Sequence, residues 1–137
     1  MAAYVKYELG IEKMMEGGNA GTDTWQLILS NTAPNVATNT TAVSATELST
    51  SGGYTAGGNN CTVTSAASTS GVYKLILADP ALWTASGGGF TFRYVILYNL
   101  TLTQCIAYWD YGSSVVMAAG DTFLADLDGA AGVFTVS

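Results

Sequence analysis

The chain of 137 residues is long enough to form one domain with its own hydrophobic core. Charged residues make up 10% of it, against roughly 25% in typical soluble domains, so most of the surface is expected to be Thr, Ser, Asn, Gly and Ala. The net charge is −6, and the four basic residues are scattered along the chain. Nucleic acid is therefore not an expected partner, because phosphate binding needs clustered lysine and arginine. A surface with so little charge does little to keep molecules apart and suits a protein that packs against others.

The sequence predicts neither a membrane span nor a secretion signal. The longest uncharged apolar stretch, residues 94–109, is interrupted by polar residues and is shorter than the roughly 20 residues that a membrane-spanning helix needs. Charged residues near the start, among them Lys6, Glu8 and Glu12, would interrupt the apolar segment of a signal peptide. Export through the usual pathway is not expected.

The two cysteines, Cys61 and Cys105, stand far apart and lack the C-x-x-C spacing of zinc sites and redox motifs. They are expected to be buried free cysteines that act as small apolar residues. The alternative is a single disulfide, which would require an oxidising compartment. No metal or other cofactor is expected.

Residues 1–18 are predicted to form a short amphipathic helix or an extended arm. Val5, Leu9 and Met14 recur near helical spacing, and a glycine pair follows as a helix stop. Gly10 weakens the helix. In the alternative, the segment is an arm that becomes ordered against a neighbouring subunit, and the rest of the domain would fold without it.

From residue 24 onward the hydrophobic pattern alternates. Residues 24–30, "TWQLILS", predict a strand with one well-buried face. Residues 35–52 are predicted to be a long loop with at most one short edge strand, too polar to fill the domain's own core. Glycine pairs on both sides of Tyr54 allow sharp turns, and its ring is expected to anchor the loop on an apolar surface. A phosphate-binding loop is not favoured, because the Lys-Ser/Thr of that motif is missing.

Further short strands are predicted along the second half of the chain. The segments "CTVTSA" and "GVYKLILA" read as a hairpin, and "TQCIAYWDYG", "SVVM", "GDTFLADLDG" and "GVFTVS" read as later strands. The strongest strand is "FTFRYVILYN", which is apolar on both faces, with one face formed by Phe90, Phe92, Tyr94, Ile96 and Tyr98. Such a strand is typical of the centre of a sandwich.

These elements predict an all-β fold. We expect about eight to ten short strands separated by Gly, Asn and Asp turns. The predicted architecture is a single-domain antiparallel β-sandwich or jelly roll over residues 1–137, with the N-terminal helix or arm attached.

Arg93 lies in the middle of this most apolar strand. A buried unpaired charge costs several kcal/mol, so Arg93 needs an acidic partner or access to a surface. Asp110, at the end of the following aromatic segment, is the predicted partner if the two strands are antiparallel neighbours. The alternative is that Arg93 takes part in an interface.

The sequence offers little catalytic chemistry, and the protein is predicted not to be an enzyme. It contains no histidine, so Ser-His-Asp and Cys-His nucleophiles are excluded. Paired carboxylates could still hydrolyse glycosides, and the candidates are Asp110, Asp121, Asp126 and Asp128. "DLDG" at residues 126–129 lacks the further acids of a calcium loop, and a hairpin turn is the preferred interpretation.

Segments along almost the whole chain resemble a family of small virion proteins of tailed bacteriophages. The resemblance is carried by "YVKYELGIEKM", "TDTWQLILSNTAP", "ELSTSGGYTAGG", "LWTASGGGFTFRYVILYN", "YWDYGSSVVMAAGDTF" and "GVFTVS". These motifs are turns and core aromatics, so the resemblance implies a structural virion protein and supplies no catalytic residues.

The resemblance is greatest to capsid decoration, or cement, proteins. It implies a protein made in the host cytoplasm that binds the major capsid protein on the outside of the phage head and associates with itself as a dimer or trimer. The alternatives are a tail, fibre or adaptor component of the virion, and a carbohydrate-binding domain with Trp83, Tyr108, Trp109 and Tyr111 as stacking platforms.

The predicted contacts with the capsid or partner fall in two segments, the N-terminal segment and the long loop. The first has a distinct, charged composition, and the second is long and polar. The candidate contact residues are Tyr4, Lys6, Tyr7, Glu8, Ile11, Met14, Met15, Asn35, Val36, Thr40 and Tyr54.

Overall fold

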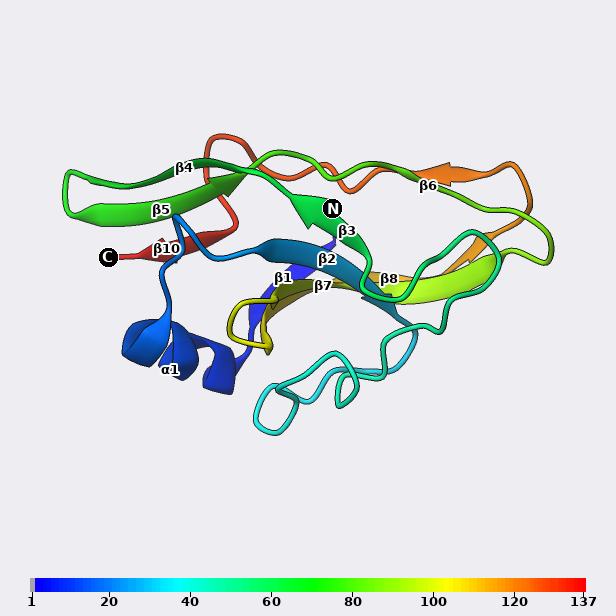
Figure 1. The fold of residues 1–137 in the computed structure, drawn as a ribbon, viewed down its shortest axis with the longest axis horizontal. Helices are drawn as coiled ribbons and strands as arrows, with labels where there is room; N and C mark the ends of the chain where they lie inside the picture. The colour runs from blue at the N-terminus through cyan, green and yellow to red at the C-terminus, as the bar shows by residue number, and fades with distance from the viewer. Residues whose placement is uncertain (1) are drawn as a thin grey trace.

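A computed structural model describes residues 2–137 and shows an antiparallel β-sandwich with a helix and a long loop on one side (Figure 1). The main sheet has the order β1-β8-β7-β2-β3, formed by Ala3–Lys6, Gln104–Met117, Phe90–Asn99, Trp25–Ser30 and Asn59–Cys61. The second sheet has the order β10-β5-β4, formed by Phe134–Val136, Val72–Leu77 and Val63–Thr69. Two further short strands pair with each other, β6 (Trp83–Thr84) and β9 (Thr122–Phe123). The predicted all-β fold is confirmed.

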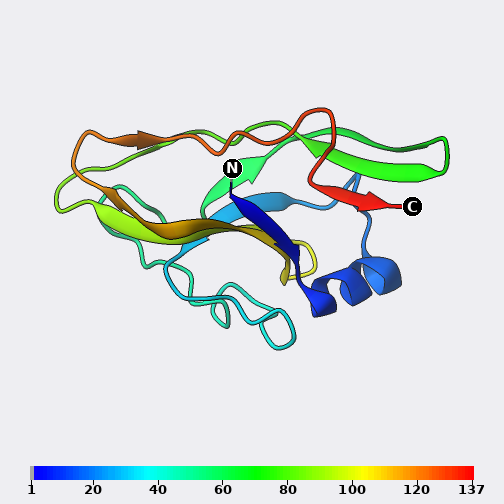
Figure 2. The ribbon, with the colours of Figure 1, turned by 180° about the vertical axis from the view of Figure 1, so that it is seen from behind.

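The sheets form two layers, which Figures 1 and 2 show edge-on from opposite sides. The second sheet and the β6–β9 pair lie above the main sheet. Below the main sheet lie helix α1 (Glu8–Gly17) and residues 31–47, which we call the covering loop. The face of the main sheet turned toward this loop is its outer face.

The main core lies between the two sheets. Alternating residues of the central strands supply it, as expected for a sandwich. Its fully buried members include Trp25, Leu27, Leu29, Leu75, Phe92, Leu97 and Ile106.

A second, smaller core lies on the outer face. Tyr7, Ile28, Ala45, Ile96, Tyr98 and Cys105 are buried there, with Val36, Ala42 and Tyr108 packed against them. Part of this cover comes from the covering loop, so the prediction that residues 35–52 do not fill the domain's own core is wrong. The loop can cover this core with small apolar residues, because the large side chains of the core come from the sheet. These small residues are Val36, Ala42 and Ala45.

Strand β7 is the central strand of the main sheet, as predicted, but its side chains do not alternate along its whole length. Phe92 pairs with Val115 and Tyr94 with Asp110, so the single residue Arg93 stands opposite residues 111–114 of β8. This bulge resets the alternation. Phe90, Phe92, Val95 and Leu97 therefore contact the main core, whereas Ile96 and Tyr98 lie in the outer core. The predicted single face from Phe90 to Tyr98 is wrong for this reason.

The N-terminal segment combines a strand and a helix. Ala3–Lys6 form β1 and pair antiparallel with β8, and α1 begins only at Glu8. Tyr7 between them is fully buried in the outer core, and Met14 of α1 is buried in the main core. The prediction of an arm that is dispensable for folding is wrong, because removing residues 1–18 would uncover both cores.

Gly10 allows α1 to approach the main sheet closely. A Cβ at this position would meet the Cys105 carbonyl oxygen and the Ile106 Cα well inside van der Waals contact. The glycine therefore has a packing role that outweighs its low helix propensity.

Several local predictions can now be decided. β4 and β5 form the predicted hairpin, with Ser70 and Gly71 at its tip, both at positive φ. "SVVM" is the end of the long strand β8 rather than a separate strand. The predicted turn at Asp128-Gly129 is present, since Asp128 accepts hydrogen bonds from the backbone N–H groups of Ala130 and Ala131. It is not a hairpin turn, because β10 pairs with β5 and not with β9.

Both cysteines are buried and free, as predicted. Burial raises the pKa of each thiol to about 12, with nearby carboxylates adding to the shift. Such thiols are unreactive at neutral pH, because the thiolate is the nucleophilic form. Over residues 2–137, none of the helical structure is long and apolar enough to cross a membrane.

The close approach at Gly10 predicts that Gly10→Ala lowers the free energy of unfolding by about 1–3 kcal/mol, because the added methyl group would push α1 away from β8. Gly17→Ala is the matched control in the same helix, since its Cβ would meet nothing within 4 Å. Urea denaturation of both variants measures the difference. Equal stabilities for the two variants would contradict a packing role for Gly10.

Candidate interaction surface

The covering loop has little regular secondary structure, yet its own polar groups hold it in one conformation. The Asn39 side chain accepts a hydrogen bond from the Asn35 N–H and donates one to the Ser44 carbonyl oxygen, at 2.6 and 2.8 Å. The Ser44 hydroxyl accepts from the N–H groups of Thr40 and Thr41. Asn and Ser favour such local bonds between side chain and backbone. The polar residues that made the segment read as an ordinary connecting loop in the sequence are thus the ones that order it in the structure.

Backbone hydrogen bonds fix the covering loop to the rest of the fold. The Glu8 N–H donates to the Val36 carbonyl oxygen at 3.0 Å, and the Cys105 N–H donates to the Thr40 carbonyl oxygen at 2.6 Å. These bonds join the loop to the start of α1 and to β8. The two segments predicted to make contacts are therefore neighbours in the structure.

Glu47 closes the covering loop at its C-terminal end. Its carboxylate accepts hydrogen bonds from the Tyr54 hydroxyl at 2.7 Å and from the Gly57 N–H at 2.5 Å. The Tyr54 hydroxyl in turn accepts from the Leu29 N–H of β2 at 3.0 Å. Burial, followed by the hydrogen bond to Glu47, raises the pKa of Tyr54 above its ordinary range. A charged group thus fastens the end of the loop to the main sheet.

We call the exposed side chains of two neighbouring elements, α1 and the covering loop, the contact face. On α1 they include Glu8, Glu12, Lys13 and Glu16, whereas the exposed Met15 lines a pocket with Tyr73 and Phe134 of the second sheet. On the loop they include Asn35, Thr38, Val43 and Ser44. Both elements lie on the same side of the main sheet in both views (Figures 1 and 2).

The predicted contact residues divide by exposure. Tyr7, Met14 and Tyr54 are buried in the folded chain, and their assignment to a contact surface is corrected. The ring of Tyr54 packs near Trp83 and Phe90, which confirms its predicted anchoring role. Side chains that remain accessible are those of Tyr4, Lys6, Glu8, Met15 and Asn35, while Ile11, Val36 and Thr40 are half-buried.

Sequence reasoning missed two important residues of this region. Val43 is 88% exposed at the far side of the covering loop, although it is apolar. Glu47 anchors the loop as described. Signals for both existed: Val43 is an isolated large apolar residue in a polar stretch, and Glu47 is the one charged residue between Asp23 and Lys74.

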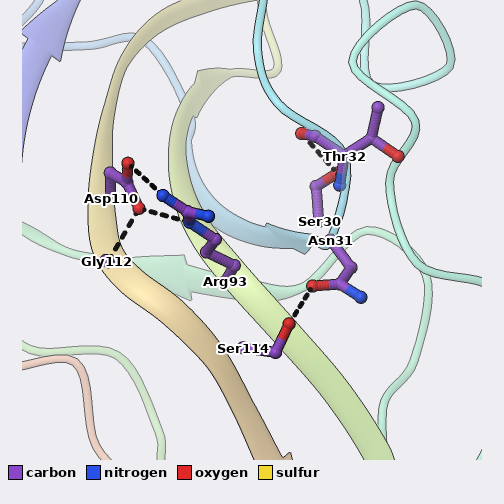
Figure 3. A network of polar contacts seen from close by, with 7 residues as sticks. All are labelled: Ser30, Asn31, Thr32, Arg93, Asp110, Gly112 and Ser114. Atoms are coloured by element: carbon purple, nitrogen blue, oxygen red, sulfur yellow. Dashed lines mark hydrogen bonds and ion pairs between the residues drawn. The ribbon is translucent and has the colours of Figure 1, made fainter.

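The predicted ion pair between Arg93 and Asp110 is present (Figure 3). The guanidinium donates two hydrogen bonds to the carboxylate, from Nε at 2.8 Å and from Nη2 at 3.1 Å. The Gly112 N–H also donates to Asp110 at 2.8 Å, and the Arg93 guanidinium lies 5.3 Å from the centre of the Tyr94 ring. The hydrogen bond from Arg93, followed by that from Gly112, holds the pKa of Asp110 below its ordinary value.

The ion pair is located at the bulge in β8 and is partly accessible to solvent. The exposed fractions of the two side chains are 36% for Arg93 and 28% for Asp110. On the same bulge, the Ser114 hydroxyl donates to the Asn31 side chain at 3.2 Å, which links β8 to the start of the covering loop (Figure 3). The charge therefore stabilises an irregular part of the sheet rather than lying in the core.

The aromatic residues considered as carbohydrate platforms lie in different environments. Trp83 is buried and stacks between Tyr54 and Phe123, so it is not accessible to a sugar. Tyr108 and Trp109 are half-buried, and Tyr111 is 39% exposed. The four residues do not form one platform.

Most candidate catalytic acids have structural partners. Asp110 binds Arg93, while Asp121 and Asp128 accept hydrogen bonds from nearby backbone N–H groups. Asp126 is exposed in the segment that leads to β10. Within residues 2–137, the structure does not gather three or more acidic or cysteine side chains into a metal-binding group.

No protein-family model matches the chain, and comparisons with curated proteins and with solved structures gave no significant match. The class of the protein is thus defined by its own structure: an antiparallel β-sandwich whose outer face is covered by an ordered polar loop.

The ion pair predicts a pH-dependent contribution to stability. Because the folded-state pKa of Asp110 is below its ordinary value of roughly 4, the contribution is present at neutral pH and is lost as the pH falls through the folded-state pKa. Asp110→Asn should therefore lower the melting temperature at pH 7 and have a smaller effect near pH 2. Thermal melts at both pH values, with the exposed Asp126→Asn as control, measure this. An equal loss at both pH values would contradict the assignment.

Proposed function

We propose that this protein is a phage capsid decoration protein that binds the outside of the major capsid protein lattice and stabilises the head. The contact face, formed by α1 and the covering loop, is the proposed capsid-binding surface. The protein would act by adhesion, since the side chains on this face carry no evident catalytic arrangement.

The observation that carries the proposal is the ordered covering loop. A polar loop that is already held by its own hydrogen bonds loses little conformational entropy when it binds, so its contacts contribute more directly to affinity. Asn39 and Ser44 fix the backbone, while Val43 projects as an exposed apolar side chain. The resemblance to phage virion proteins and the low content of charge point to the same kind of role.

The proposed mechanism is bridging between capsid subunits. A molecule that contacts two neighbouring subunits must lose both contacts before either subunit can leave the shell. When many copies bind one lattice, weak individual contacts gain strength through effective concentration, by roughly 10² to 10⁴. The two parts of the contact face could provide such separate contacts.

The test uses particles of the phage that encodes this protein, assembled with and without its gene. We expect several hundred copies per virion, bound at the head, and particles without the gene that break at lower temperature or lower osmotic stress. Added purified protein should restore resistance. A few tens of copies or fewer, located at the tail, would overturn the proposal in favour of a tail, fibre or adaptor component.

Substitutions on the contact face should weaken capsid binding without unfolding the protein. Val43→Asp places a charge on an exposed apolar position of the covering loop, 88% accessible. We expect this variant to bind particles at least about tenfold more weakly, since a charge buried at an interface costs well over 1.4 kcal/mol. Sedimentation of particles with bound protein measures the loss.

The matched control is Leu124→Asp, which adds a charge at a 49% exposed leucine next to β9, away from the contact face. Its binding should equal that of the original protein, and both variants should keep its melting temperature. Normal binding by Val43→Asp would remove the covering loop from the proposal.

A further inference from the structure

Strand β1 is one of the two edge strands of the main sheet, and β3 is the other. It pairs with β8 on one side, and Figure 2 shows it at the front of the molecule, with no other strand of residues 2–137 beyond it. All four of its residues are exposed. An edge of this kind presents unpaired backbone groups to which another strand can bind.

The pairing with β8 decides which backbone groups are free. Tyr7 donates its N–H to the Ile106 carbonyl oxygen at 2.9 Å, and Val5 stands opposite Tyr108 in the same register. In an antiparallel ladder, the backbone N–H and C=O groups of successive residues point alternately to the strand on one side and to the opposite side. Ala3 and Val5 therefore bond to β8, whereas Tyr4 and Lys6 direct their N–H and C=O groups to the open edge.

We propose that β1 pairs antiparallel with β1 of a second copy of this chain, about a two-fold axis that passes beside Val5. Tyr4 and Lys6 lie symmetrically about Val5. In this register Tyr4 stands opposite Lys6 of the second copy, and each such pair exchanges two backbone hydrogen bonds. All the outward N–H and C=O groups of Tyr4 and Lys6 are then satisfied, which makes the edge complementary to itself.

Side chains next to the edge support a second copy as the occupant. A groove of about 310 Å³ runs along β1 and is lined by Tyr4, Lys6 and Trp109 together with the acidic residues Asp126 and Asp128. The groove thus has two carboxylates and one ammonium group. In the proposed register, Lys6 of the second copy enters beside Tyr4, where it meets the aromatic ring and the excess negative charge of the groove.

Lys6 also disfavours other occupants. A lysine on a short edge strand opposes pairing with any strand whose neighbouring surface does not accept its charge. Pairing with a second copy is the arrangement in which the same molecule provides both the lysine and the acidic groove.

The proposed dimer is weak in solution and positioned for binding to a lattice. Four residues per copy bury far less than the roughly 1,200–2,000 Å² of stable complexes. The two-fold axis is perpendicular to the main sheet, so the contact faces of both copies point to the same side. This last consequence alone rests on the proposed function. The dimer itself does not, and its test contains no capsid.

The first experiment is disulfide cross-linking of Val5→Cys in the purified protein. Val5 faces its own counterpart as a non-hydrogen-bonded pair, in which Cα atoms are roughly 4.5 Å apart, within the range that a disulfide spans. Mild oxidation should convert most of this variant to a covalent dimer. The control is Val116→Cys, whose site is 71% exposed against 37% for Val5, so random collision would favour the control. The native thiols are buried and do not compete.

A second pair of variants tests whether the contact is strand pairing. Lys6→Pro, added to Val5→Cys, removes an N–H that β8 does not use, and should reduce the cross-linking rate to that of the control. Lys6→Ala keeps the N–H and should retain faster cross-linking. Cross-linking of Val5→Cys no faster than Val116→Cys, or unaffected by the proline in a folded variant, would overturn the proposal.

Hydrogen exchange of the original protein keeps the test valid if the proline variant does not fold. The Tyr4 and Lys6 amides should exchange several-fold more slowly at millimolar than at micromolar protein concentration, while the exchange of the Val5 amide, already bonded to β8, changes less. Exchange rates at Tyr4 and Lys6 that do not depend on concentration would also overturn the proposal.

Discussion

A sheet with large apolar side chains on both faces must be covered on both faces, and the rest of this fold follows from that constraint. On β7, Val95 and Leu97 lie in the main core, and Ile96 and Tyr98 lie in the outer core. Each of these side chains is nearly or fully buried. Burying each such side chain contributes roughly 1.5–3 kcal/mol. The second sheet covers one face, and Tyr7 with the covering loop covers the other.

An irregular loop can cover a sheet when its backbone polar groups find partners within it. Buried N–H and C=O groups that lack partners are costly, and a third sheet would normally supply them. Here the side chains of Asn35, Asn39 and Ser44 supply them within the loop, and Thr40 bonds directly to β8. The solvent-exposed side of the covering loop is nearly uncharged. The loop therefore covers the outer core with one side and contributes to the proposed contact face with the other.

The sequence predicted the strands well because alternation is a local signal. β2, β7 and the β4–β5 hairpin lie where they were expected, and the partner of Arg93 followed from the high cost of an unpaired charge. The bulge opposite Arg93 could not be predicted, because it depends on how β8 meets β7. Burial of Tyr7 and Met14 was missed for a similar reason: their neighbours come from distant parts of the chain, and both residues stand among charged and polar residues in the sequence.

The order of strands in the main sheet also determines when the fold can form during synthesis. β1 pairs with residues 107–110, β2 pairs with residues 94–99, and β5 pairs with the last strand of the chain. A nascent chain can form the β2–β3 pair and the β4–β5 hairpin early, but β1 and the β7-facing edge of β2 lack partners until residues 94–110 have been synthesised. Contacts between such distant segments make folding slow. Few large apolar residues lie between residues 31 and 58, so this part of the unfolded chain exposes little apolar surface that could cause aggregation before folding is complete.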